Sequence, residues 1–227
     1  MSGAAFNGTH RFSARVPEDV VPNEVFSFEI KMHLASWVFP PGYRICVAIS
    51  NSMWPMLWPT PTPFKSTLMI SGNGGARIQL PVIPPEQPRV PESKEPVTGP
   101  RLQGFETLDA DNSTGYAPIT EVQVDPETDE AFGFATKSGA NRFPWGVQRF
   151  YEQIEHRTHD EQPATTSVTG RYFLIQEFGD RTLRFEQEVS FSSDIKNFYL
   201  RFDRKLLLDG EVQNQRVWDE VIERDFQ

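Results

Sequence analysis

A period of two in hydrophobicity recurs along this chain and constrains its fold more than any other feature. In the segment 26–34, polar residues separate apolar residues at every second position; the apolar ones are Phe26, Phe28, Ile30, Met32 and Leu34. Such alternation is typical of a strand with one buried face. No segment of ten or more residues carries the spacing of an amphipathic helix. The chain is therefore predicted to be all-β.

Further strands are predicted in two regions separated by a long irregular stretch. In the first region they follow the turn at Pro40-Pro41-Gly42 and flank the glycine-rich turn 72–75. In the last third they are joined by turns at Gly179-Asp180 and Asp209-Gly210, which are good hairpin sequences. The expected segments are 44–50, 67–71, 77–82, 168–178, 183–191, 198–208 and 211–218. Short strands at this spacing predict a β-sandwich or jelly roll.

The chain of 227 residues is predicted to form one domain, 1–227, in three parts. Residues 1–83 supply the first strands and residues 144–227 supply the closing strands. Residues 84–143 form an irregular Pro-rich and acidic insertion. Seven prolines lie between residues 81 and 100, and eight acidic residues lie between 101 and 135 against one arginine. We expect that acidic stretch to be an exposed hairpin or an irregular excursion.

The charge balance and composition exclude several classes of protein. The formal net charge of −9 argues against a protein that binds nucleic acid through phosphates, because such binding needs a positive field. The single cysteine, Cys46, excludes an intrachain disulfide framework. No run of 18 apolar residues and no signal-peptide pattern is present, so we expect no membrane partner and a cytoplasmic location by default.

The motifs that carry catalysis are missing from the sequence. No serine stands in a G-x-S-x-G context, and no phosphate-binding glycine-rich motif is present. We therefore predict no catalytic residue, no metal and no cofactor in this chain. The only histidine cluster, His156 and His159, puts its imidazoles on opposite faces of a strand. A strand end followed by a polar turn explains the pair best, and a substrate-contacting or interface role is the other interpretation.

The loop from residue 54 to residue 64 is rich in proline and presents Trp54, Trp58 and Phe64. Repeated prolines cannot pair in a central strand, so the segment is an extended or turn-rich loop. Three interpretations stay open. The loop packs under its own fold, forms part of a ligand pocket, or docks on another domain or a second copy. The three aromatic residues, with His156 and His159, are the candidate ligand or interface residues.

Several short motifs occur in an order that resembles one known family. Phe39-Pro40-Pro41-Gly42 and the strand that follows it resemble the "fPPGHRIRLAISSS" strand in the C-terminal domain of the X-prolyl dipeptidyl-peptidase and cocaine-esterase family. Tyr43 replaces the usual histidine of that motif. Further similar motifs are Gly8-Thr9-His10-Arg11, Leu80-Pro81-Val82, His159-Asp160-Glu161-Gln162-Pro163-Ala164, and Trp218 with Ile222-Glu223-Arg224-Asp225-Phe226. The resemblance covers most of the chain except about residues 84–143.

The resemblance implies a non-catalytic part of a serine hydrolase. Members of this family combine an α/β-hydrolase domain, a helical cap and a β-sandwich, and their catalytic triad precedes the sandwich. The resemblance therefore implies a jelly-roll-like β-sandwich of the galactose-binding-like kind. Nothing in this chain matches the triad, so the chain is predicted to be inactive alone. It would be a truncated fragment, a stand-alone remnant, or the partner of a separate hydrolase chain. In that role it would help to wall the substrate pocket and to assemble the enzyme. The alternatives are a stand-alone carbohydrate-binding-like module and a homo-oligomerisation module.

Overall fold

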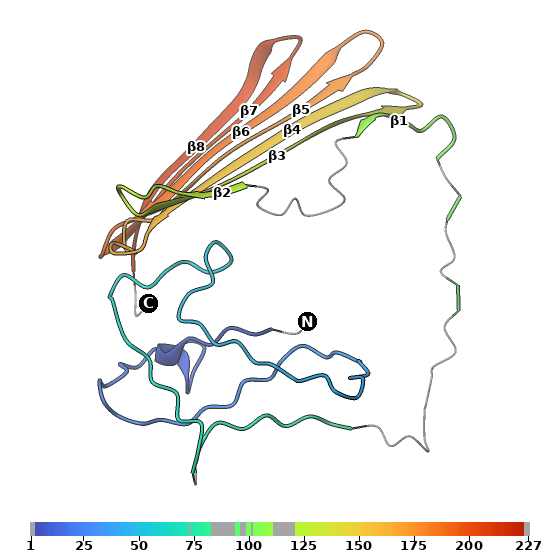
Figure 1. The fold of residues 1–227 in the computed structure, drawn as a ribbon. Helices are drawn as coiled ribbons and strands as arrows, with labels where there is room; N and C mark the ends of the chain where they lie inside the picture. The colour runs from blue at the N-terminus through green and yellow to red at the C-terminus, as the bar shows by residue number, and fades with distance from the viewer. Residues whose placement is uncertain are drawn as a thin grey trace.

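A computed structural model describes residues 3–72, 74–82, 94–95, 99–100, 102–110 and 121–224 (Figure 1). Its elements are one short 3-10 helix, η1 (Gly8–His10), and eight β-strands. The strands are β1 (Glu106–Ala110), β2 (Glu121–Val124), β3 (Glu130–Phe143), β4 (Gly146–His159), β5 (Ser167–Glu177), β6 (Thr182–Ser193), β7 (Asn197–Leu208) and β8 (Glu211–Glu223). This content confirms the all-β class and is consistent with a β-sandwich.

All eight strands belong to one antiparallel sheet. Its order is β1-β3-β4-β5-β6-β7-β8, and β2 also pairs with β3. From β3 onward each strand therefore lies beside its neighbour in the chain, as in an up-and-down meander. The long strands run side by side in Figure 1, and the irregular N-terminal part of the chain lies to one side of them.

The predicted alternation gives this sheet two different faces. Residues that pair directly across strands share a face, which assigns side chains to faces from the register alone. We call the first the apolar face; it carries Phe150, Ile154, Val168, Leu174, Phe185, Val189, Phe191, Phe198, Leu200, Phe202 and Trp218. The opposite, polar face carries cross-strand ion pairs such as Arg171–Glu188 and Arg201–Asp219. A sheet with one buried side requires one apolar face and one polar face.

The strands predicted in the last third are confirmed, with small changes at their ends. β5, β6 and β7 match the predicted segments closely, and β8 runs five residues past the predicted end at Trp218. The turn between β7 and β8 has positive φ at both Asp209 (50°) and Gly210 (86°). Two consecutive residues with positive φ match the right-handed twist of the flanking strands, which is why an Asp-Gly pair predicts a hairpin.

The four strands predicted in the first 83 residues are not formed. Segments 26–34, 44–50, 67–71 and 77–82 carry no strand assignment in the structure. Their apolar side chains are mostly exposed, as Met32 and Ile49 show at 50% and 67%. Alternation requires an extended backbone, but a strand also needs a neighbour that completes its hydrogen-bond ladder. The predicted turn is present, because Gly75 N donates to Gly72 O at 3.2 Å and Ala76 N to Met69 O at 2.7 Å.

The acidic part of the predicted insertion is ordered within the sheet. β1, β2 and β3 all lie between residues 84 and 143, so this stretch is not irregular throughout. The exposed hairpin that the sequence allowed is the one formed by β2 and β3. At its turn, Asp125 Oδ1 accepts a hydrogen bond from Glu127 N at 2.8 Å, and this bond lowers the pKa of Asp125. Most of the Pro-rich stretch 84–100, and Asp111, lie outside the described residues.

Candidate functional site

Trp58 joins the N-terminal part of the chain to the sheet. Its ring packs edge-on against Phe191 of β6 and Phe198 of β7, with centroids 4.7 and 5.9 Å away. Its Nε1 donates a hydrogen bond to the Oγ of Ser193 at 2.8 Å. The next residue, Pro59, is buried. Figure 1 shows this cyan segment reaching the end of the sheet near the C-terminus. The loop thus packs on its own fold, as the first of the three interpretations expected.

Ser193 links the loop to the turn between β4 and β5. The Ser193 hydroxyl accepts from Trp58 and donates to the backbone oxygen of Ala164. The backbone N–H of Ser193 donates to Thr166 O at 3.0 Å. Thr166 is fully buried and donates its own hydroxyl to Pro163 O at 2.9 Å. Each polar atom named in this chain of hydrogen bonds has a partner, as a buried polar cluster requires.

Arg224 closes the site from the end of β8. Its Nη2 donates to Pro59 O at 2.6 Å, and its Nη1 donates to Asp194 O at 3.0 Å. The guanidinium also lies 4.7 Å from the ring centroid of Phe198, a cation–π distance. Burial lowers the pKa of Arg224, and the nearby Asp194 carboxylate opposes that effect. One side chain therefore holds the loop, the β6–β7 turn and an aromatic ring together.

Trp54 and His156 form the outer part of the site. The Trp54 ring meets Trp58 at 5.2 Å and His156 at 5.6 Å, edge-on in both cases. The Nδ1 of His156 is buried and has no hydrogen-bond partner among the residues that the structure describes. Burial lowers the pKa of His156. Burial therefore favours the neutral imidazole, whose ring stands nearly perpendicular to the Trp54 indole.

The structure brings together three of the five predicted site residues. Trp54, Trp58 and His156 are in mutual or consecutive contact. His159 is three residues from His156 on β4, so it lies on the polar face, where its Nδ1 accepts from Glu161 N at 3.2 Å. Phe64 is 56% exposed, and no ring contact within the described part of the chain includes it. Sequence reasoning missed Ser193, and it did not single out Arg224 although Arg224 lies in a motif already quoted.

The acid–base behaviour of His156 gives a test of its burial. The pKa of His156 in the folded chain is lower than its ordinary value of 6.5. Below pH 6.5 the unfolded chain therefore binds more protons at His156 than the folded chain does. The free energy of unfolding should therefore be largest above pH 6.5 and fall as the pH drops below it. Chemical unfolding measured at pH 7.5 and 5.5 should show this decrease, and His156→Gln should flatten it. His159→Gln is the matched control and should leave the decrease unchanged; equal behaviour of the two variants would refute the assignment.

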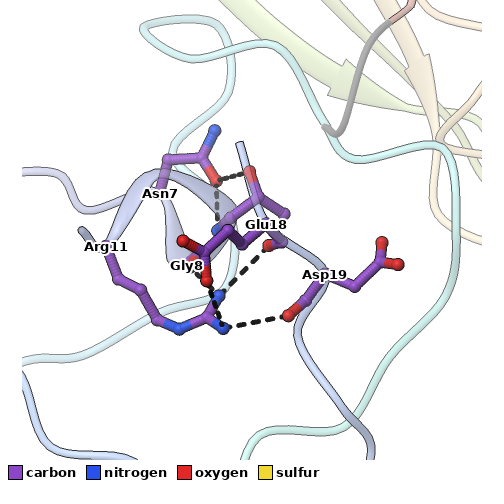
Figure 2. A network of polar contacts seen from close by, with 6 residues as sticks. Asn7, Gly8, Arg11, Glu18 and Asp19 are labelled. Carbon is purple, nitrogen blue, oxygen red and sulfur yellow. Dashed lines mark hydrogen bonds and ion pairs between the residues drawn. The ribbon is translucent and has the colours of Figure 1, made fainter. Parts of the chain in front are cut away.

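A second polar cluster lies in the N-terminal segment around Arg11 (Figure 2). The Arg11 guanidinium donates to the backbone oxygens of Gly8, Glu18 and Asp19 at 3.0, 3.1 and 3.0 Å. The side chain of Asn7 caps η1 by accepting from Thr9 N at 3.0 Å. Arg11 thus fixes the path of residues 8–19, although that path contains no strand.

These contacts define an all-β protein whose N-terminal segment is held against one end of an antiparallel sheet. Residues 3–79 match the family model described as the X-Pro dipeptidyl-peptidase C-terminal non-catalytic domain. The match covers about a third of the chain and contains both the Arg11 cluster and the tryptophan loop. It confirms the family resemblance. No curated protein and no solved structure gives a significant match. Within the described residues, no helix is long and apolar enough to cross a membrane.

Proposed function

We propose that this chain is a non-catalytic β domain that serves an α/β-hydrolase acting on amide or ester bonds. The observation that carries the proposal is the family match of residues 3–79, a segment that the sheet anchors through Trp58 and Arg224. The hydrolase would be another domain or a separate chain. A cytoplasmic location remains a prediction of the sequence.

The anchored loop is the proposed point of contact with the catalytic partner. Trp54 and His156 present a half-buried aromatic surface beside Trp58. Because Trp58 is already held by Ser193 and two phenylalanines, the outer pair is presented by a rigid support. A rigid aromatic edge suits a surface that walls a substrate pocket, since ordering it on binding costs little entropy. Phe64, which is exposed, would extend this surface.

The proposal predicts that the purified chain does not hydrolyse substrates by itself. The release of p-nitroaniline from Gly-Pro-p-nitroanilide and of p-nitrophenol from p-nitrophenyl acetate should be no faster than in buffer. A fluorophosphonate probe should label no serine. The physical reason is that no serine of this sequence stands in the G-x-S-x-G context, which forms the strained turn that exposes and activates a nucleophile. Turnover that the probe abolishes would contradict the proposal.

A carbohydrate-binding module is the other function that the aromatic loop allows. Trp58 is occupied by contacts within the chain, so Trp54 and Phe64 would have to form the binding platform. A panel of monosaccharides is titrated into the protein while its tryptophan fluorescence is recorded, and this measurement distinguishes the two functions. Saturable binding that Trp54→Ala removes would favour the carbohydrate-binding module over the hydrolase domain.

A further inference from the structure

The outer edge of β8 is a long unpaired strand edge. β8 ends the strand order of the sheet and pairs only with β7 among the described strands. Its exposed side chains include Val217 at 42%, Val221 at 64% and Ile222 at 46%. Long edges with exposed apolar side chains pair readily with another strand unless charge or shape prevents it.

Arg216 on this strand lies in an unfavourable position in the single chain. Its direct cross-strand partner on β7 is Arg204, and like charges opposite each other destabilise a sheet. Both guanidiniums gather at Trp218, with Arg216 4.5 Å and Arg204 5.4 Å from the centroid of that ring. Neither arginine makes an ion pair with any described residue. Both side chains are exposed, so a carboxylate from outside the chain can reach them.

The symmetry of a sheet edge determines where such a carboxylate could come from in a second copy. Two identical edges pair antiparallel only about a two-fold axis perpendicular to the sheet. This axis keeps the apolar faces of both copies on the same side of the joined sheet. Each residue of β8 therefore lies opposite a residue of the other copy whose number differs from its own by an even amount. Glu211 and Glu220 are the acidic residues of β8 on the face of Arg216, but the bulge between Val212 and Asn214 separates Glu211 from the regular part of the strand. Arg216 and Glu220 lie together in that regular part. Within one strand the two residues are about 13 Å apart, too far for contact.

We propose that β8 pairs with β8 of a second copy, in the register centred on Trp218. In this register Arg216 of each copy lies opposite Glu220 of the other, so two ion pairs form. The two Trp218 side chains lie opposite each other, and Ile222 lies opposite Asn214. On the polar face Asp219 meets Val217, and no like charges are directly opposed between residues 213 and 223. The inference does not depend on the proposed function, because it uses only the sheet of this chain.

A charge-swap experiment on the full chain tests this pairing. Analytical ultracentrifugation over a dilution series should show a dimer for the wild type. Arg216→Glu places glutamates opposite glutamates, and Glu220→Arg places arginines opposite arginines. Each variant should weaken the dimer about tenfold or more, because two repulsive pairs replace two attractive ones. The double variant Arg216→Glu/Glu220→Arg restores both pairs with reversed polarity and should recover the dimer.

Several outcomes would overturn the pairing. They are a wild type that stays monomeric at every concentration, single variants that dimerise like the wild type, and a double variant no better than either single one. Arg181→Glu, in the turn before β6, makes the same charge change away from β8 and should leave the dimer intact. Glu220→Gln removes a charge without adding one and should weaken the dimer less than Glu220→Arg. Circular dichroism checks that each variant keeps its β content.

Discussion

Trp58→Ala should lower the free energy of unfolding by about 3 kcal/mol, within the range for removing a large aromatic from a packed site. The variant loses ring packing against Phe191 and Phe198 and leaves Ser193 without its indole donor. Urea unfolding followed by circular dichroism measures the change. The N-terminal segment should also become easier to cleave with protease, because Trp58 is a main contact between that segment and the sheet.

Two further variants, Trp37→Ala and Trp58→Phe, show which interaction of Trp58 causes the loss of stability. Trp37 is 77% exposed, so Trp37→Ala removes an equal volume and should change stability by less than about 0.5 kcal/mol. Trp58→Phe keeps an aromatic ring and loses the hydrogen bond, which should cost about 1 kcal/mol. If Trp58→Ala were no more destabilising than Trp37→Ala, the loop would not be anchored as described.

Arg224→Gln should lower the free energy of unfolding by about 2–4 kcal/mol. It removes charged donors from Pro59 O and Asp194 O, and Pro59 is buried, where an acceptor left unpaired is costly. Arg224→Lys should rescue little of this loss, because one ammonium cannot reproduce the planar fork that reaches two separate carbonyls. The same urea titrations measure both variants.

Arg201→Gln provides the matched control for Arg224. Arg201 lies 2.6 Å from Asp219 in an ion pair, but its side chain is 59% exposed. Exposed pairs contribute at most about 1 kcal/mol, so this variant should be close to the wild type. Equal effects at the two positions would show that Arg224 is an ordinary surface arginine, which would contradict the structure.

The sequence predicted the sheet well where local pattern and turn chemistry agreed. In β6 and β7 the alternation specifies which face is apolar, and Asp209-Gly210 specifies the turn that lets β7 and β8 pair. The segment 26–34 has stronger alternation than either strand, yet it forms none. Its pattern could not show whether a neighbouring strand lies beside it, since pairing is a long-range property of the fold.

The site was predicted in part, because only some of its residues are unusual in type. Tryptophans in a proline-rich loop and a histidine pair attract attention in any sequence. Ser193 is one serine in a run of polar strand residues, and nothing local distinguishes it. A usable signal existed for Arg224. Three segments attract attention separately in the sequence: the tryptophan loop, the turn that ends at Ala164, and the closing motif with Arg224. The structure joins them at one end of the sheet.

Trp58 anchors the family-matched segment to the sheet, and the proposed function depends on this contact. A nuclear Overhauser experiment on the indole N–H proton of Trp58 tests it most directly. We expect cross-peaks from this proton to protons of Ser193 and to ring protons of Phe191. A Trp58 N–H that shows cross-peaks only to its own loop, and exchanges rapidly with water, would show that the segment is not anchored to the sheet.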